Sequence, residues 1–170
     1  ASDGMKVAIN VTAMILALVA LVAFIDWVLG LGGMFCYKFI PGCSHFAFLS
    51  HLSLKLILGK VFAIFAIILG VPLHDASTVG ALMGTKLVLN EMVAYVGLTH
   101  AAQSIDPKSF MIASFALCSF GNFGSIAIQI GGIGELAPNQ KKNLARLGLR
   151  ALICGTLSCY LSAAIVGVLL

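Results

Sequence analysis

Two short polar segments interrupt an otherwise apolar sequence: Gly84-Thr85-Lys86-Leu87-Val88-Leu89-Asn90-Glu91 and Ser119-Phe120-Gly121-Asn122-Phe123-Gly124-Ser125. Each lies in the middle of a stretch whose hydrophobicity is typical of a membrane-embedded segment. A carboxylate and two amides are costly at bilayer depth, so we expect these groups to contact one another, water or a substrate. The other segments are interpreted as the scaffold that holds these two.

The composition is that of an integral membrane protein. Of the 170 residues, 61% are hydrophobic and only 9% are charged, and the mean hydropathy is +1.10, whereas soluble domains carry about 25% charged residues. So few charges cannot cover a water-exposed surface, and we expect a multi-pass protein in the lipid bilayer of the cell membrane. The net charge of +4 comes largely from one basic cluster and does not indicate a nucleic-acid partner.

Five hydrophobic segments are apparent. The first is long enough to cross a hydrocarbon core of about 30 Å as a helix that rises about 1.5 Å per residue. In the second, Lys55 and Lys60 favour a helix lying at the membrane interface, and the alternative is a tilted span whose lysines extend toward the interface. Residues 30–50 are expected to form a loop between these two. The segments are 7–29, 52–71, 77–98, 109–133 and 151–170.

The third segment, 77–98, contains Lys86, Asn90 and Glu91. A single helix would place a charge pair near the bilayer centre. A hairpin that enters the membrane and returns would place the same residues at its tip, where irregular backbone can line a cavity. We favour the hairpin, in which an ion pair between Lys86 and Glu91 is the simplest structural explanation of the two charges.

The fourth segment, 109–133, is interrupted by Gly121-Asn122-Phe123-Gly124. If it stays helical, Asn122, Ser125 and Gln129 share one face. If it unwinds at the glycines, backbone groups join these side chains, and a broken helix of this kind is typical of a transporter's binding site. The alternative is a polar contact between two helices.

A polar stretch from Glu135 to Arg150 precedes the last segment and is expected to be a loop. Because cytoplasmic loops are enriched in lysine and arginine, we predict that residues 141–150 are cytoplasmic. The four basic residues are Lys141, Lys142, Arg146 and Arg150.

The residue patterns favour binding rather than catalysis. The sequence contains no phosphate-binding loop, metal-ligand cluster or serine–histidine–acid arrangement, so we predict no enzyme, no metal and no bound cofactor. Glu91, Asn122 and Ser125 offer hydrogen-bond acceptors and donors that suit a neutral, hydroxyl-rich ligand, since an anion would call for arginine. From the residues alone, the prediction is a transporter or channel for a polar neutral solute.

Three stretches closely resemble signature segments of the concentrative nucleoside transporters: GTKLVLNEMVAY at 84–95, ALCSFGNFGSIAIQIGG at 116–132 and LARLGLRAL at 144–152. Within these stretches Met92 replaces the usual phenylalanine, and Gly121 replaces an alanine found in many members. The resemblance implies a nucleoside symporter coupled to sodium or protons, working by alternating access as a homotrimer. It also implies that Glu91, Asn122 and Ser125 bind the ribose, with Phe120 and Asn90 in the same pocket.

The resemblance covers only the C-terminal half of the family. It implies an all-α membrane fold, the second half of an inverted-repeat transporter: a long transmembrane helix, an interfacial helix, a re-entrant hairpin, a broken transmembrane helix and a final transmembrane helix. We therefore expect residues 1–170 to supply the ribose-binding half of a longer transporter, with the N-terminal half as its missing partner and the first span as a candidate trimer surface. The alternative is a truncated, non-transporting membrane protein or an interaction subunit.

Overall fold

The computed structural model describes residues 2–39 and 53–170. Within these residues every regular element is helical, and the all-α prediction is confirmed. The elements are α1 (Ser2–Phe39), α2 (Leu54–Ile68), α3 (Leu73–Val88), α4 (Glu91–Ala101), α5 (Pro107–Leu117), α6 (Phe123–Leu136), the short 3-10 helix η3 (Pro138–Gln140) and α7 (Lys141–Leu169).

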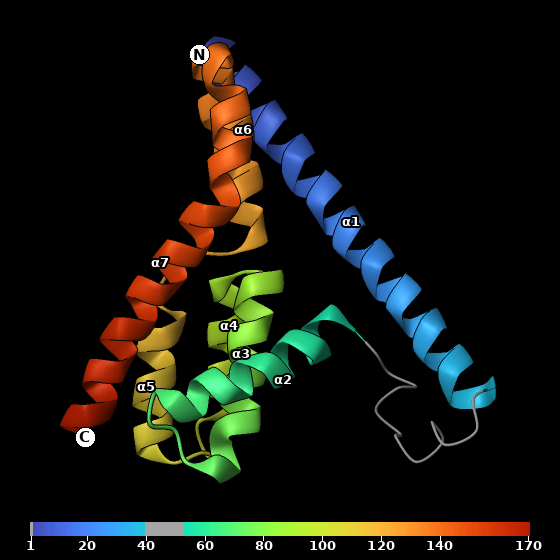
Figure 1. Cartoon of the computed structure of the whole chain (residues 1–170). Helices are drawn as coiled ribbons and strands as arrows, with labels where there is room; N and C mark the ends of the chain where they lie inside the picture. The colour runs from blue at the N-terminus through green and yellow to red at the C-terminus, as the bar shows by residue number, and fades with distance from the viewer. Residues whose placement is uncertain (1, 40–52) are drawn as a thin grey trace.

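Helices α1 and α7 frame the molecule. The segments Ser2–Phe35 and Pro138–Leu169 are long and apolar enough to cross a membrane. Figure 1 shows that α1 and α7 are close together near the N-terminus and diverge toward the other end, where the C-terminus lies. Leu16, Phe24 and Trp27 of α1 are each more than half exposed, so α1 presents a large apolar surface to its surroundings.

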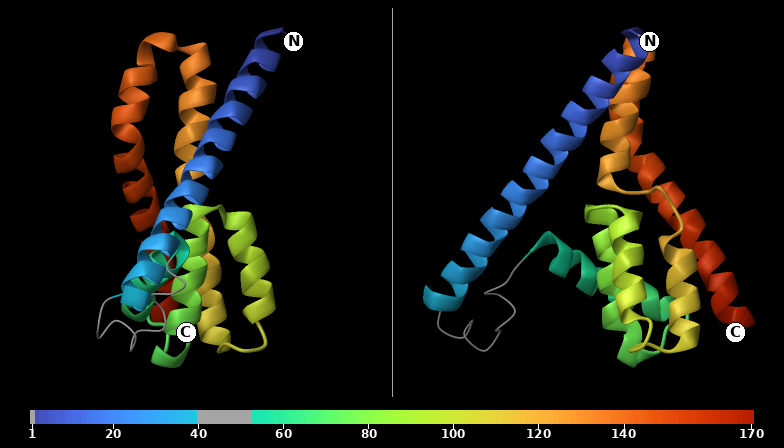
Figure 2. Two further views of the ribbon diagram at one scale, coloured as in Figure 1. Left: turned by 90° about the vertical axis from the view of Figure 1, so that its right-hand side faces the viewer. Right: turned by 180° about the vertical axis from the view of Figure 1, so that it is seen from behind.

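The predicted re-entrant hairpin is confirmed. Helices α3 and α4 run antiparallel, and together they occupy only one half of the molecule's height, so the chain enters and returns on the same side (Figures 1 and 2). The hairpin runs from Leu73 to Ala101 and is thus somewhat longer than the predicted 77–98. Helix α2 lies across the hairpin, in the orientation expected of an interfacial helix (Figure 1).

The broken span is also present, but its break lies earlier than predicted. Helix α5 runs beside the hairpin, and α6 continues in the same direction toward the N-terminal end of α1 (Figure 2). The break covers Cys118–Asn122, and α6 begins at Phe123, so Gly124 is helical. The reason is that Asn122 caps α6, which allows the helix to start directly after it.

Two predicted loops are helical over much of the part that the structure describes. Helix α1 continues through Phe39, so the first part of the expected loop 30–50 belongs to α1, and residues 40–52 lie outside the described ones. The expected loop from Glu135 to Arg150 is replaced by the end of α6, the short η3 and the first turns of α7. Polar and charged side chains do not oppose a helix where it leaves the membrane, because lysine, arginine and glutamine have good helix propensity.

Small residues bring α2 and α3 into close contact. A Cβ atom added to Gly80 would lie 2.4 Å from the backbone nitrogen of Ala63, and one added to Gly84 would lie 2.8 Å from that of Gly59. The spacing of four residues on both helices is the small-residue pattern that allows membrane helices to approach closely. The apolar core includes side chains of α2 and α3 as well as of α4, α5 and α7, among them Phe62, Met83, Leu98, Ile112 and Tyr160.

Candidate functional site

Asn122 organises the start of α6. Its side-chain oxygen accepts a hydrogen bond of 2.8 Å from the backbone nitrogen of Ser125, while the Ser125 hydroxyl accepts one of 3.2 Å from the backbone nitrogen of Asn122. This reciprocal arrangement is a capping box, which satisfies amide groups that the first turn of a helix leaves without partners. Both side chains are buried.

The hairpin tip is built in a similar way. Asn90 caps α4, and its side-chain oxygen accepts a hydrogen bond of 2.9 Å from the backbone nitrogen of Val93. Glu91, the first residue of α4, is half-buried, whereas Asn90 is exposed. The start of α4 thus determines where the polar side chains of the hairpin tip, Asn90 and Glu91, are placed.

The two helix starts meet at Glu91. The side-chain nitrogen of Asn122 donates a hydrogen bond of 3.0 Å to Glu91 Oε2. The amino-terminal ends of α4 and α6 carry partial positive charge, which stabilises a carboxylate placed there. The simple structural alternative of an ion pair between Lys86 and Glu91 is not formed, because Lys86 instead donates to the hydroxyl of Ser119.

A cavity of about 510 Å³ opens beside the Glu91–Asn122 pair. One wall is α1 and the other is formed by the hairpin tip and the start of α6. Four of the five predicted site residues line it, namely Asn90, Glu91, Phe120 and Asn122. Ser125 lines a neighbouring cavity of about 200 Å³ together with Gln129, and Phe120 lines both cavities.

Sequence reasoning missed Asp26 of α1. It lines the larger cavity, and its Oδ1 accepts a hydrogen bond of 2.6 Å from the backbone nitrogen of Leu54 at the start of α2. In the sequence, Asp26 reads as the polar end of the first span. The signal that could have found it is that Asp26 is the only charged residue of the first hydrophobic segment, 7–29.

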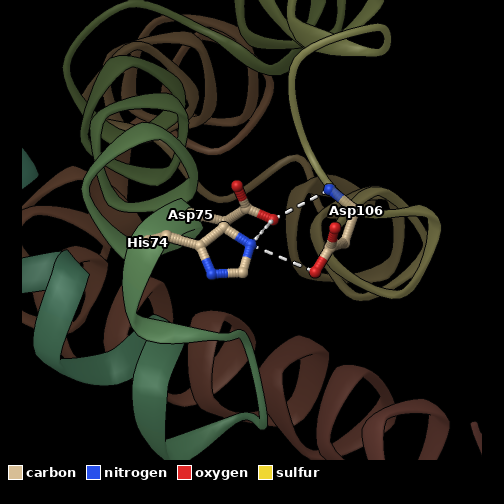
Figure 3. Close-up of side chains that lie close together, drawn as sticks. All are labelled: His74, Asp75 and Asp106. Atoms are coloured by element: carbon tan, nitrogen blue, oxygen red, sulfur yellow. Dashed lines mark hydrogen bonds and ion pairs between the residues drawn. The ribbon is translucent and has the colours of Figure 1, made fainter.

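A second polar cluster joins the far ends of the hairpin and the broken span. The Nε2 atom of His74 lies 3.1 Å from Asp106 Oδ2 and 3.5 Å from Asp75 Oδ2 (Figure 3). Asp75 Oδ2 also accepts a hydrogen bond of 2.9 Å from the backbone nitrogen of Asp106. Burial raises the pKa of Asp75, but the Ser109 hydroxyl, the Asp106 amide and His74 together bring that pKa below its ordinary value.

This second cluster has the spacing of a metal site, since its three ligand atoms lie within 4.8 Å of one another. However, Asp75 lies in the first turn of α3, and Asp106 is the N-cap residue of α5. Both carboxylates therefore balance the partial positive charge of a helix start. We interpret the cluster as a junction that joins the beginnings of the two elements.

Comparison with known proteins identifies the family. The family model "Na+ dependent nucleoside transporter C-terminus" matches residues 1–167. This chain belongs to that family. The predicted resemblance to concentrative nucleoside transporters is confirmed, and the family is one of transporters rather than enzymes.

Relatives in bacteria and animals cover almost the whole chain. Transporter YutK of Bacillus subtilis is 45% identical over 98% of this chain and 39% of its own length. Nucleoside permease NupC of Helicobacter pylori is 39% identical over 98% of this chain and 38% of its own. Human solute carrier family 28 member 3 is 34% identical over 99% of this chain and 25% of its own. The chain therefore spans less than half the length of these relatives.

Solved structures of CNTnw share the fold. A CNTnw variant in an outward-facing state is 38% identical, with a TM-score of 0.81 over 98% of this chain and 40% of that protein. CNTnw in an inward-facing substrate-bound state is 40% identical, with a TM-score of 0.69 over 98% of this chain and 39% of that protein. At nearly equal identity, this chain superposes better on the outward-facing arrangement.

Proposed function

We propose that this chain supplies the ribose-binding, C-terminal half of a nucleoside symporter in the cell membrane, coupled to sodium or protons. The missing partner would be the N-terminal half of the same transporter. The observation that carries the proposal is the hydrogen bond between Glu91 and Asn122, formed where two helices begin and beside a cavity of about 510 Å³.

The chemistry of this pair suits the hydroxyl groups of a ribose. A carboxylate accepts several hydrogen bonds, and only Glu91 Oε2 is used by Asn122. The Asn122 amide has two N–H groups, of which one donates to Glu91, so the second can donate to a substrate oxygen. A ribose hydroxyl can donate to Glu91 and accept from Asn122 at the same time, which a simple apolar ligand cannot do.

The other predicted residues take different roles in this proposal. Phe120 is 59% exposed and lies between the two cavities, where its ring offers an apolar face to a nucleoside. Ser125 already donates to the backbone oxygen of Asn122 at 2.6 Å, so in the ligand-free site it orients Asn122. Asn90 holds the first turn of α4, and through it Glu91.

Helix α1 is proposed to be the fixed scaffold against which the hairpin and the broken span move. In alternating access, a binding site between helix starts passes from one side of the membrane to the other. The TM-scores of 0.81 with outward-facing and 0.69 with inward-facing CNTnw indicate that the overall arrangement of this part of the fold is closer to the outward-facing state, and the proposal attributes the difference to such a movement. The exposed apolar surface of α1 is the proposed contact in a homotrimer.

The orientation follows from the basic residues at the start of α7. We propose that residues 141–150 face the cytoplasm, because lysine and arginine are retained on that side. Cysteine substitution of the exposed Lys142 in a protein whose own cysteines are replaced, followed by labelling with a membrane-impermeant maleimide, tests this assignment. Labelling only after the membrane is permeabilised is expected, and labelling in intact cells would contradict it.

The proposed function is tested by radiolabelled uridine uptake in cells that lack nucleoside transport. Saturable uptake is expected from the full-length transporter that contains this chain and not from residues 1–170 alone, which carry only half of the proposed site. A folded, membrane-inserted full-length protein without uptake would refute the proposal and favour a non-transporting membrane protein. Removal of sodium, and separately collapse of the proton gradient, would identify the coupling ion.

A further inference from the structure

Lys86 is the most deeply buried charged residue among those whose burial the structure describes. It is 1% exposed, and it is the largest fully buried side chain among the described residues. Among those residues no carboxylate forms an ion pair with it. Its ammonium group donates a hydrogen bond to the Ser119 hydroxyl instead. A buried charge without an ion-pair partner is destabilising, so the presence of a lysine at this position needs a physical explanation.

The surroundings of Lys86 are the carbonyl ends of two helices. It lies in the last turn of α3, and Ser119 directly follows Cys118, the C-cap residue of α5. Carbonyl ends of helices carry partial negative charge and stabilise a cation. The last carbonyls of α5 are also held by other side chains, since the Tyr95 hydroxyl donates to Ser114 O at 2.7 Å and Cys159 Sγ lies 2.9 Å from Phe115 O.

Lys86 and Glu91 therefore form two complementary junctions between the hairpin and the broken span. Before the hairpin tip, Lys86 in the last turn of α3 contacts Ser119, which follows the end of α5. After the tip, an anion lies at two amide ends and contacts Asn122. Because one contact precedes the hairpin tip and the other follows it, the two together fix the position of the tip relative to the break between α5 and α6 better than either contact alone.

We propose that Lys86 is a positioning residue that fixes the hairpin tip on the break between α5 and α6, and thereby sets the geometry of the Glu91–Asn122 pair. This inference rests on the proposed function, because it assigns to that pair the binding of ribose hydroxyls. Lys86 itself does not line the larger cavity. Its effect on a ligand is therefore transmitted through the hairpin tip.

The test compares uridine with 2′,3′-dideoxyuridine, which lacks the two hydroxyls that the pair is proposed to bind. In the full-length transporter, Lys86→Met is expected to raise the KM of uridine by about 10- to 100-fold, the usual effect of a misplaced binding group. The inhibition constant of dideoxyuridine is expected to stay within about twofold of wild type, because the interactions it uses are unchanged. Lys142→Met, the same substitution at an exposed position, is the matched control.

A merely structural role predicts another result. It would lower the amount of folded transporter and the maximal rate, with the ratio of the uridine KM to the dideoxyuridine inhibition constant unchanged, and this outcome would overturn the proposal. If Lys86→Met does not reach the membrane, Ser119→Ala decides, since it removes only the acceptor. An increase in the ratio of about threefold or more is expected, as for loss of one hydrogen bond, and an unchanged ratio would again overturn the proposal.

Failure of the proposed function can be distinguished from failure of this inference. A folded wild-type protein without uridine uptake refutes the proposed function. In that case a double-mutant cycle of thermal unfolding with Lys86→Met and Ser119→Ala still tests the junction. Non-additive effects are expected, and additive ones would show that the two side chains do not act together.

Discussion

The hairpin and the broken span each contain a break between two helices, and in both the second helix begins with an asparagine cap. They differ in the direction that the chain takes after the break. In the hairpin the chain reverses over Leu89 and Asn90, whereas in the broken span it continues in the same direction after Cys118–Asn122. In both, an asparagine oxygen accepts a hydrogen bond from a backbone nitrogen three residues later, at 2.9 Å and 2.8 Å. The difference is burial, since Asn90 is exposed and Asn122 is 2% exposed.

Burial distinguishes the cap that belongs to the proposed binding site from the one that does not need a partner. The amide nitrogen of exposed Asn90 can be solvated, but that of buried Asn122 needs a partner, because a buried polar group without one is costly. Glu91 supplies that partner at 3.0 Å. The same residue type in the same local role is therefore expected to contribute mainly to helix stability in the hairpin, and to both stability and binding in the broken span.

The largest expected effect comes from breaking the contact between the two regions. Glu91→Gln removes the charge that accepts from Asn122, and hydrogen bonds to charged groups contribute about 1.5–3 kcal/mol. Uridine uptake by the full-length transporter is expected to fall by about 10- to 100-fold, since each 1.4 kcal/mol corresponds to a factor of ten. Asp3→Asn, at an acid whose side chain is 91% exposed, is the control. Wild-type uptake by Glu91→Gln would rule out its role.

The two caps themselves are compared by Asn122→Ala and Asn90→Ala. Each change removes a helix cap and is expected to destabilise the protein by about 0.5–2 kcal/mol. Only Asn122→Ala also leaves Glu91 without its partner, so its KM for uridine is expected to rise by about tenfold or more. Thermal unfolding in detergent and uptake kinetics measure the two effects separately. Equal KM values for the two variants would contradict the distinction between a buried and an exposed cap.

Glycine packing distinguishes the regions in a second way. In the hairpin, a Cβ on Gly84 would meet the backbone of Gly59 at 2.8 Å, whereas in the break a Cβ on Gly121 would meet the Thr156 hydroxyl at 3.2 Å. A backbone cannot turn aside, but a side chain can, so Gly84→Ala is expected to destabilise by about 1–3 kcal/mol. Gly121→Ala is expected to cost less than about 1 kcal/mol.

Thermal unfolding of the purified protein measures both glycine variants. Gly155→Ala is the control, because a Cβ there would have no atom within 4 Å. A destabilisation by Gly121→Ala as large as that by Gly84→Ala would show that the break is packed as rigidly as the hairpin.

Small effects on stability are also expected at the junction of His74, Asp75 and Asp106, which joins the same two regions at their far ends. His74→Ala removes an imidazole that is itself 65% exposed, together with its ion pairs to exposed Asp106 and buried Asp75, and its effect on unfolding is expected to be about 0–1 kcal/mol. Asp75→Asn weakens the buried acceptor of the Asp106 amide and is expected to cost about 1–2 kcal/mol. Calorimetry or a thermal shift assay measures the destabilisation by each variant. A larger destabilisation by His74→Ala than by Asp75→Asn would contradict the expectation that the buried Asp75 contributes more to this junction.

Several features were readable from the sequence for physical reasons. A chain with 9% charged residues cannot be water-soluble, and the charged group at 86–91 could avoid the bilayer centre most simply at the tip of a hairpin. The position of the break was less readable. Glycine suggested unwinding at 121–124, yet among the described residues only Gly70 has a positive φ, so the break does not use glycine's conformational freedom. Capping by Asn122 sets it instead.

The partners of the two charges could not be inferred from the sequence. Lys86 and Glu91 are close in the chain, and a local ion pair was the simplest expectation. Their actual partners, Ser119 and Asn122, lie more than 30 positions away. The spacing of two charges in the sequence does not show which end of a distant helix lies next to each of them. Here Lys86 contacts the residue that follows the carbonyl end of α5, and Glu91 contacts the cap at the amide end of α6.

By itself, the sequence determined the membrane setting, the succession of helices and the two polar segments, because composition, hydrophobic length and motif residues are local properties. Only the tertiary structure decided that α1 walls the cavity, that Asp26 lines it and that His74 meets two aspartates. These features depend on how helices distant in the chain pack together. Contacts of that kind follow from the small residues and helix ends that the folded protein brings together.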